Sequence, residues 1–268
     1  MAGVETIEAL IVVRTYPTPA KKNVEVSCTA GITRDGKWVR LFPIPYRFLD
    51  DDKRFHKYQW IKANVRKAAD HRAESYVVDV DSLEIVSDAI GTDDAWRARK
   101  DLVLPHRAHC LCCLKKERDA RKEPTLGIVR PGAVQGLVLE PVEAEWSADE
   151  LASLRREQEQ GGFFKTPPVS ELEKVPFNFK YAFTCAESAC KGHHLNCTDG
   201  ELGASWRSWR ARYGDEWEAK FRQRYERDMI ERLDTHFFVG TLKAHPAQWN
   251  IVGLFYPPKT TGNLFGPN

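Results

Sequence analysis

The sequence predicts an α+β fold, in which a small antiparallel β-barrel or sandwich precedes a mixed region with a metal-braced loop and a C-terminal helical segment. Three observations carry this prediction. Short strand-like runs separated by turn signals fill the N-terminal third of the chain. Three cysteines and two histidines crowd the stretch "CAESACKGHHLNC". Aromatic residues recur every three or four positions within Gly203–Leu233, which is the period of a helix.

The first predicted unit comprises residues 1–92. Its expected strands are Ile7–Thr15, Glu25–Thr33, Lys37–Phe42, Tyr58–Lys67 and Ser75–Val86. The first run ends at "YPTP", because proline cannot donate to a strand ladder. Asp35 and Gly36 separate the second run from the third and predict a hairpin, since glycine accepts the backbone angles of a tight turn.

The second predicted unit comprises residues 93–268. A short helix is expected to open at Asp93 or Asp94. The basic segment after it contains "HCLCC", whose cysteines are either metal ligands or incidental residues of a flexible loop. Ser147 and Glu150 form a capping box and predict a further helix. The expected strands are Thr125–Val129, Ala133–Glu140, Phe177–Thr184, Thr235–Leu242 and Trp249–Tyr256.

Two glycine-containing segments punctuate this second unit. Gly161–Pro176 is rich in glycine and proline and is interpreted as a linker. Gly214 interrupts the long aromatic stretch and is expected to divide it into two helices. We expect the two units to pack as one compact body.

The composition describes an ordinary globular chain, with 42% apolar and 11% aromatic residues among 268 positions. The formal net charge of +2 supplies no global field for a polyanion, so nucleic-acid binding must come from local patches. Neither a signal peptide nor a membrane-spanning stretch is recognisable, so we expect a cytoplasmic location and no membrane partner. There, the seven cysteines are expected to be reduced, metal-bound or catalytic rather than disulfide-paired.

Several motifs of nucleotide and hydrolase chemistry are absent from the sequence. There is no P-loop, no G-x-G-x-x-G after a strand, no G-x-S-x-G and no H-E-x-x-H. The H-x-E and P-C-x-x-C pair of zinc deaminases is missing as well. Nucleotide hydrolysis, a nucleotide cofactor and Rossmann-type redox chemistry are therefore not expected.

The Cys/His stretch predicts a metal site. Cys185, Cys190 and His193 offer two thiolates and an imidazole within two tight turns, and Zn²⁺ prefers these donors. His194 and Cys197 are alternative local ligands, and an all-cysteine set would favour an iron–sulfur cluster. Distant candidates for the fourth ligand are Cys28, Cys110, Cys112 and Cys113. The alternative interpretation is that the cysteines are core residues and the histidines lie exposed on a loop.

Two carboxylates follow this stretch directly, in "CTDGELG", where a helix is expected to begin. Helix capping accounts for at least one of Asp199 and Glu201. The functional alternative is a rigidly placed catalytic carboxylate that orients water or stabilises a developing cation. Asp79 and Asp81 in "VVDVDS" are reserve candidates for that role.

Cations and aromatic residues gather at the ends of the N-terminal strands and on the first turns of the long helix. Such side chains can stack on bases and bind backbone phosphates. Ordinary strand composition and a solvated charged helix face are the alternative explanations. The candidates for nucleic-acid binding are Arg14, Tyr16, Arg40, Tyr46, Arg47, Arg207 and Arg210.

Segments from most of the chain carry a resemblance to a known family. They are "RTYPTPAKK", "VSCTAGIT", "WVRLFPIPYRFL", "FHKYQWI", "FNFKYAFTCAESACKGHHLNCTDGEL" and "FFVGTLKAHPAQWNIVGLFYPP". Together they resemble a bacterial family of dual OB-like domain proteins of mobile elements and phage-defence loci. The resemblance implies OB-like barrels and a recurrent metal-ligand set of Cys28, Cys185, Cys190 and His193. Gly200 departs from the family pattern, which has a bulky residue between the aspartate and the glutamate.

The size and motifs are also similar to those of phage-defence DNA glycosylases that remove sugar-modified cytosine. This similarity implies base flipping, hydrolysis of the N-glycosidic bond to leave an abasic site, and Asp199 and Glu201 as catalytic carboxylates. It further implies that the metal is a structural Zn²⁺, with an iron–sulfur cluster as the alternative. The alternative function is a non-catalytic, metal-stabilised OB-like module that binds nucleic acid.

Overall fold

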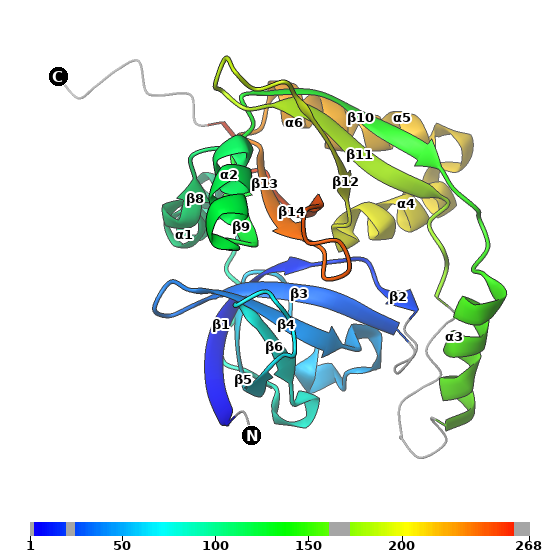
Figure 1. Cartoon of the computed structure of the whole chain (residues 1–268). Coiled ribbons are helices and arrows are strands. Elements are labelled where there is room, and N and C mark those ends of the chain that lie inside the picture. The colour runs from blue at the N-terminus through cyan, green and yellow to red at the C-terminus, as the bar shows by residue number, and fades with distance from the viewer. Residues whose placement is uncertain (1–2, 20–24, 161–171, 260–268) are drawn as a thin grey trace.

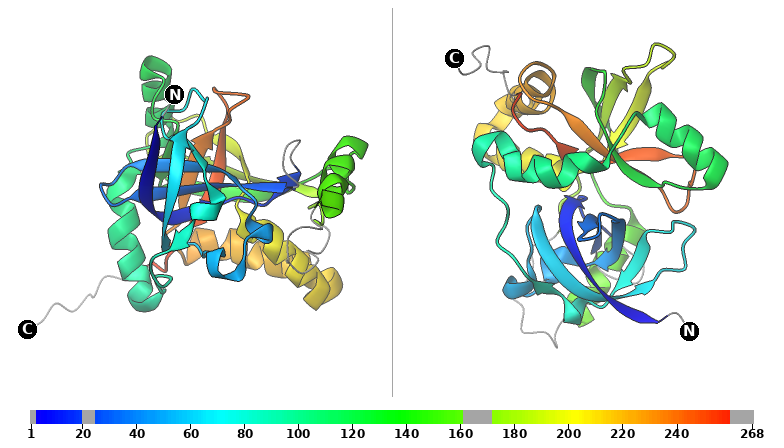
Figure 2. Two further views of the ribbon diagram at one scale, coloured as in Figure 1. Left: turned by 90° about the horizontal axis from the view of Figure 1, so that it is seen from below. Right: turned by 90° about the vertical axis from the view of Figure 1, so that its left-hand side faces the viewer.

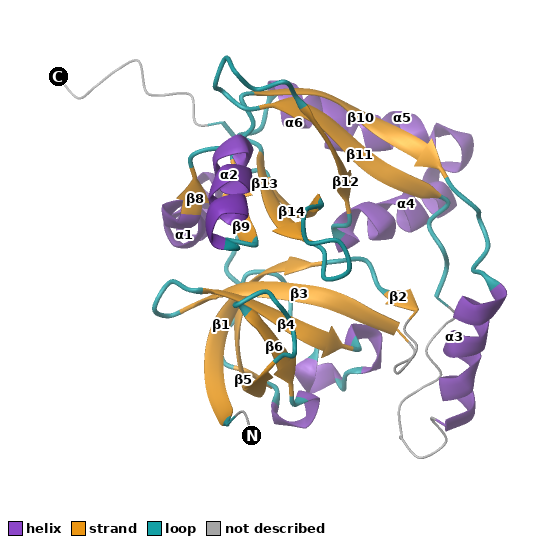
Figure 3. Ribbon diagram, in the orientation of Figure 1, coloured by secondary structure: helices purple, strands orange, loops and turns teal. Residues whose placement is uncertain are grey.

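The protein consists of a β-barrel and a second sheet that are stacked on each other, with helices around the second sheet and a further helix beside the barrel (Figure 1). The computed structural model describes residues 3–19, 25–160 and 172–259. The predicted α+β class is confirmed (Figure 3). None of the helices within these ranges combines the length and the apolarity that a membrane span requires.

The N-terminal barrel confirms the predicted OB-like unit. Its strands are β1 (Val4–Arg14), β3 (Glu25–Thr33), β4 (Trp38–Ile44), β5 (Gln59–Lys67) and β6 (Ser75–Val78). They follow the order β1-β3-β4-β6-β5, and β5 pairs back with β1 to close the barrel. The β4–β6 pair is parallel and the other pairs are antiparallel. Short strands β2 (Thr18–Pro19) and β7 (Glu84–Ile85) flank it.

Local sequence explains the barrel strands with one exception. The predicted hairpin is present, since Gly36 turns with φ +79° and Ile32 pairs with Trp38 across β3 and β4. The prediction of one continuous strand over Ser75–Val86 is wrong, because a 3-10 turn at Val80–Ser82 separates β6 from β7. Alternate residues along the strands fill the interior of the barrel. They include Ala9, Ile11, Val39, Leu41, Ile61, Ala63 and Val65.

The second sheet has the order β10-β11-β12-β14-β13-β9-β8. Its strands are β8 (Arg107–Ala108), β9 (Leu126–Val129), β10 (Ala133–Pro141), β11 (Phe177–Thr184), β12 (His193–Cys197), β13 (His236–Thr241) and β14 (Trp249–Phe255). The β12–β14 and β8–β9 pairs are parallel. Part of the stretch expected to be a metal-braced loop is therefore a strand, β12, in the middle of this sheet.

The helices are α1 (Asp93–Val103), α2 (Leu111–Arg121), α3 (Ala148–Gln160), α4 (Gly200–Tyr213), α5 (Trp217–Arg222) and α6 (Asp228–Glu231). The basic segment is largely α2, so the alternative of a flexible loop is excluded. The capping box is confirmed, since Ser147 and Glu150 bond to each other in both directions before α3. Most of the expected linker, residues 161–171, lies outside the described residues.

The aromatic helical segment covers one face of the second sheet (Figures 1 and 2). Phe221 stacks on Phe179 of β11 with ring centroids 5.3 Å apart, and Trp206 is buried in the same core. Gly214 ends α4 with φ +52°, which confirms the predicted break. The spacing of three or four residues between the aromatic side chains therefore reflects a helical face that is buried against the sheet.

A third core lies between the barrel and the second sheet, and it joins them into one body. Leu10, Val12 and Trp60 of the barrel pack there with Phe238, Val252 and Phe255 of β13 and β14. Beside this core the backbone N–H of Tyr16 donates to the Thr198 carbonyl at 2.9 Å. The end of β1 is thereby fixed next to the start of α4, where the two candidate carboxylates lie.

Candidate functional site

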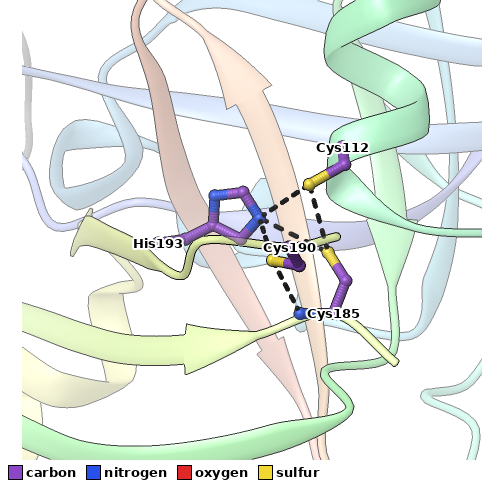
Figure 4. A group of neighbouring side chains, drawn as sticks. All are labelled: Cys112, Cys185, Cys190 and His193. Atoms are coloured by element: carbon purple, nitrogen blue, oxygen red, sulfur yellow. Dashed lines mark hydrogen bonds between the residues drawn. The ribbon is translucent and has the colours of Figure 1, made fainter. Parts of the chain in front are cut away.

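Four side chains with metal-binding donors converge at one end of the second sheet (Figure 4). Cys112 comes from the first turn of α2, Cys185 and Cys190 from the loop after β11, and His193 from the start of β12. His193 Nε2 lies 3.4 Å from each of the three sulfurs. Cys112 Sγ and Cys185 Sγ are 3.9 Å apart.

These distances match the edges of a metal tetrahedron. A tetrahedral ion with typical bonds to sulfur and imidazole places its donor atoms about 3.4–3.8 Å from one another. All four donor atoms of the cluster lie within 4.8 Å of one another. The backbone N–H of Cys185 also donates to Cys190 Sγ at 3.2 Å, which favours the thiolate form of Cys190. The Cys/His cluster could therefore hold a metal ion.

The local sequence brings three of these ligands together. β11 delivers Cys185, and the chain then turns back so that His193 pairs with Phe183 across β11 and β12. Gly192 has φ +91°, a backbone angle that side chains rarely adopt, and it allows the return immediately before His193. The β11–β12 hairpin, with Gly192 just before its second strand, thus places the thiol of Cys190 in the loop next to the imidazole of His193 on β12.

The structure corrects the expected fourth ligand. Cys28 lies on β3 of the barrel, where its backbone N–H donates to Thr15 Oγ1, and Cys112 of α2 takes the fourth place in the cluster. The alternative ligands are also displaced, because His194 is exposed next to the inward-facing His193 and Cys197 is buried in the core. Alternation along β12 therefore selects His193 alone of the two histidines.

Environment sets the proton affinities of the cluster. Burial raises the pKa of the Cys112 thiol to about 12. The backbone N–H of Cys185 lowers the pKa of Cys190, and burial lowers the pKa of His193. The imidazole is thus neutral, the form that binds metals, whereas a metal must displace the proton of Cys112.

Two further cysteines of the same segment are linked to each other. Cys110 caps α2 and forms a disulfide with Cys113. We expected the cysteines to form no disulfides, and this expectation is wrong for Cys110 and Cys113. In this state neither sulfur is a thiolate ligand, so of the three cysteines in "HCLCC" only Cys112 faces the cluster.

A second constellation surrounds the two candidate carboxylates. Lys57 Nζ donates to Asp199 Oδ2 at 3.2 Å and to Glu201 Oε1 at 2.8 Å. The Tyr256 hydroxyl donates to Glu201 Oε2 at 2.6 Å. Asp199 also accepts from the backbone N–H of Glu201 at 2.9 Å and of Leu254 at 2.6 Å. The two carboxylates are therefore held by one network that includes a barrel lysine.

The two carboxylates differ in exposure and in role. The Asp199 side chain is 0% exposed and caps α4, so its function is to fix the junction. The Glu201 side chain is 37% exposed, which leaves it accessible to a ligand. Gly200 between them packs against the end of β1, because a Cβ there would lie 3.0 Å from the Arg14 carbonyl oxygen. This close approach favours glycine at position 200.

Mutual charge determines the protonation states of this network. Burial alone lowers the pKa of Lys57, but Asp199 and Glu201 outweigh it and hold that pKa well above its usual value. Burial raises the pKa of Asp199 despite the nearby lysine. Burial would also raise the pKa of Glu201, but Lys57 and the Tyr256 hydroxyl lower it. Glu201 is therefore ionised at neutral pH, and Lys57 is charged and unsuited to act as a nucleophile.

The contribution of Glu201 to stability is expected to disappear in acid. A carboxyl whose pKa is lowered by folding stabilises the protein above its unfolded pKa and ceases to do so as the pH falls through the folded pKa. The melting temperature of the protein should therefore exceed that of Glu201→Gln near neutral pH, and the difference should shrink below pH 4.5, the usual pKa of a glutamate. Thermal unfolding of both proteins across this range is the measurement, and a difference independent of pH would contradict the ion pair.

Aromatic rings and cations surround Glu201. Trp96 of α1 lies 5.4 Å from Tyr256 and 6.4 Å from Tyr58, measured between ring centroids. Arg99 lies over the Tyr58 ring at 4.1 Å and Arg224 over the Tyr256 ring at 4.9 Å. Tyr58 has φ +64°, an angle that is rare for a bulky residue, directly before β5 begins. Tyr58 and Tyr256 are buried, so of these three rings only the half-buried Trp96 reaches solvent near the positive charge of Arg99 and Arg224.

Six of the seven predicted nucleic-acid-binding residues lie along the seam between the barrel and α4. Arg14 lies 3.6 Å over the Tyr46 ring, and the Arg207 guanidinium is 6.0 Å from the Tyr16 ring. Arg47, which forms an ion pair with Glu25, is close enough to influence the pKa of Tyr16. Arg210 forms an ion pair with Glu173, whose carbonyl accepts from the Tyr16 hydroxyl.

Arg40 is the exception, and the structure corrects its expected role. It is 3% exposed, forms an ion pair with Glu74 and donates to the Thr125 carbonyl at 2.9 Å. Its guanidinium therefore joins the barrel to the second sheet and is buried away from any phosphate. The reserve carboxylates Asp79 and Asp81 are exposed at the 3-10 turn of the barrel, whereas Lys57 pairs with Asp199 and Glu201.

Sequence reasoning missed two members of the carboxylate network and named Cys112 only as one of several candidates for the fourth metal ligand. Lys57 and Tyr256 complete the carboxylate network, and Cys112 completes the metal cluster. Isolated lysines and tyrosines give no signal, because each is common on strand ends. Cys112 did have a signal, since three cysteines within "HCLCC" are hard to explain as chance in a polar segment.

Two family models match the chain, one on each side of the link between the barrel and the second sheet. The model described as a domain of unknown function (DUF8757) matches residues 107–268. The model described as a domain of unknown function (DUF8758) matches residues 5–105. No curated protein matches the sequence.

Proposed function

The chain belongs to the family of the domain of unknown function DUF8757, and from the geometry of its sites we propose that it is a DNA glycosylase of phage defence. In this proposal it flips a glucosylated cytosine out of viral DNA and hydrolyses the N-glycosidic bond, leaving an abasic site. The observation that carries the proposal is Glu201, an ionised and partly exposed carboxylate with aromatic rings and arginines around it.

The proposed reaction uses the charge of Glu201. As the bond between the sugar C1′ and the base nitrogen loosens, its electron pair leaves with the base and positive charge develops on the sugar. The Glu201 carboxylate stabilises that charge, and a water oxygen bonds to C1′ while its proton goes to the departing base. Lys57 and Tyr256 keep Glu201 ionised and oriented, and Asp199 fixes the helix on which it lies.

The seam supplies the contacts that a flipped nucleotide requires. Trp96, which is half-buried, provides a ring on which a base can stack, and the buried Tyr256 packs against it. Arg14 and Arg207 lie near the same junction, where cations can bind the flanking phosphates. The proposed DNA path therefore runs along the barrel–α4 seam past Glu201.

The metal is proposed to be a structural Zn²⁺. Three cysteines and one histidine form a closed tetrahedral set, which leaves no open position to activate water. An iron–sulfur cluster, the alternative, is usually held by cysteines alone. One equivalent of zinc in a colourless protein is the expected result of elemental analysis and visible absorption spectroscopy. A brown protein that contains iron would show that the site holds an iron–sulfur cluster instead of zinc.

The metal would support the reaction through one strand. β12 begins at the ligand His193 and ends at Cys197, two residues before the helix cap Asp199. A metal ion that holds His193 in place would therefore also hold the segment of chain that leads into α4. This connection explains how a closed metal centre can serve a carboxylate that it does not touch.

Glu201→Gln is expected to lower the rate of base release by about 10²–10⁴-fold, the usual contribution of a positioned catalytic carboxylate. The assay incubates the protein with glucosylated phage DNA and then cleaves abasic sites with alkali. DNA binding by this variant should stay close to that of the unmodified protein. Glu218→Gln is the matched control, because Glu218 is an exposed carboxylate that pairs with Arg222 on α5. Full activity of Glu201→Gln would refute the assignment.

A second candidate function is a non-catalytic nucleic-acid-binding module stabilised by the metal. The observation that favours it is that both oxygens of Glu201 already accept hydrogen bonds, one from Lys57 and one from Tyr256. The same assay separates the two functions. Intact glucosylated DNA at protein concentrations that saturate binding would exclude the glycosylase and support the module.

A further inference from the structure

We propose that the protein binds a second divalent metal ion beside the first, through Cys110, Cys113, His109 and Glu187, once the Cys110–Cys113 disulfide is reduced. The site lies at the start of α2 and in the loop that follows β11. It belongs to neither the carboxylate network nor the proposed glycosylase reaction. Its donor set of two thiolates, one imidazole and one carboxylate suits Zn²⁺.

The four proposed donors belong to two groups that share Glu187. Ligand atoms of His109, Cys113 and Glu187 fall within 4.8 Å of one another, and so do those of Cys110, Cys185 and Glu187. His109 Nε2 is 2.7 Å from a Glu187 carboxylate oxygen. Because Cys185 is also a member of the first cluster, the two metal positions adjoin each other at its sulfur.

An unpartnered carboxylate oxygen points independently to a ligand. Oε2 of Glu187 is buried and has no hydrogen-bond partner among the described residues, while Oε1 pairs with His109. A buried carboxylate oxygen without a donor is costly, and such orphans call for an unseen ion or water. A bound cation at this position would satisfy Glu187.

Helix geometry separates the two sets of thiols. Cys110 and Cys113 are three positions apart and lie on one side of the first turn of α2, whereas Cys112 lies on another side and faces the first cluster. The backbone N–H of Cys113 donates to Cys110 Sγ at 3.0 Å, a contact that also suits a thiolate. The stretch "CLCC" therefore can serve two adjacent metal positions without sharing a residue.

Reduction is required because the disulfide sulfurs are not thiolates. A trialkylphosphine and one water molecule convert the disulfide to two thiols, and the phosphine becomes a phosphine oxide. Metal binding then displaces one proton from each thiol. The His109 side chain is 77% exposed and Cys113 is half-buried, whereas Cys110 is buried, so reductant and metal approach from the side of His109 and Cys113.

The test is the zinc content of the full chain with and without phosphine reduction. Each sample is equilibrated with Zn²⁺ and freed of excess metal by gel filtration. Two zinc ions per chain are expected after reduction and one with the disulfide intact. Cys113→Ser should hold one ion under both conditions, and Glu187→Gln should weaken the second ion by about 10-fold or more. Cys28→Ser, a thiol outside both clusters, should still hold two.

A single zinc ion in the reduced protein would overturn the proposal, as would two ions in a Cys110→Ser/Cys113→Ser variant. If the variants fail to fold, titrating the reduced unmodified protein with Co²⁺ keeps the proposal testable. Thiolate-to-cobalt absorbance should rise in two steps. The first step should have the amplitude expected for the three thiolates of the first cluster, and the second step the amplitude expected for the two thiolates of the second site. One step only would also overturn it.

Discussion

Cys112→Ser is expected to release the metal ion and to lower the free energy of unfolding by about 4 kcal/mol, the stabilisation from a ligand present at a thousand times its dissociation constant. For a domain of this size, such a loss corresponds to a fall in melting temperature of roughly 8–16 °C. The physical reason is that the four ligands join α2 to the β11–β12 hairpin and come together only in the folded chain. Metal binding therefore stabilises the folded state over the unfolded state. Elemental analysis and thermal unfolding measure both effects.

Cys28→Ser is the matched control for this prediction. It makes the same chemical change on β3 of the barrel, where the sulfur belongs to no metal cluster of the described residues. It should retain the metal and lose less than about 1 kcal/mol. A chelator should lower the melting temperature of Cys28→Ser and leave that of Cys112→Ser unchanged. Metal loss from Cys28→Ser together with its retention in Cys112→Ser would reverse the assignment.

Lys57→Met is expected to destabilise the protein by about 3–5 kcal/mol, the usual effect of removing one partner from a buried ion pair. Asp199 carries this effect, because its side chain is 0% exposed and its charge would lose the only cation within bonding distance in the described structure. Glu201 adds less, since water reaches it. Denaturant unfolding at neutral pH measures the loss.

The matched control is Lys62→Met on the same strand, where the lysine is exposed. It should change the free energy of unfolding by less than about 0.5 kcal/mol. Acid should also relieve the Lys57→Met defect, because protonating Asp199 removes the uncompensated charge. Equal effects of the two substitutions, or a defect that does not depend on pH, would show that the ion pair does not brace the junction.

Together these effects concern one junction. Lys57 precedes β5 of the barrel, Asp199 precedes α4, and the metal cluster holds the far end of β12. The carboxylate network therefore joins the two sheets, whereas a metal ion in the Cys/His cluster would order the chain that leads to it. Loss of either should move Glu201, so a metal-free protein should lose the proposed glycosylase activity before it loses the barrel.

The sequence alone determined the local structure. Alternating apolar residues predicted most strands, Asp35-Gly36 predicted the hairpin, and the Ser147 capping box predicted α3. It also located Cys185, Cys190 and His193, which lie close together in the chain and now form one cluster. These features depend on hydrogen bonds and side-chain periods between near neighbours, so a short stretch of sequence contains the information.

Only the tertiary structure decided which distant residues complete the sites. Cys112 meets Cys185 across 73 positions, and Lys57 meets Asp199 across 142. Arg40 carries the same charge as Arg14, yet packing buries it in an ion pair with Glu74. Such pairings depend on how the barrel docks on the second sheet and on which side of α2 faces β12. Those outcomes arise from the packing of complete elements, and no local pattern encodes them.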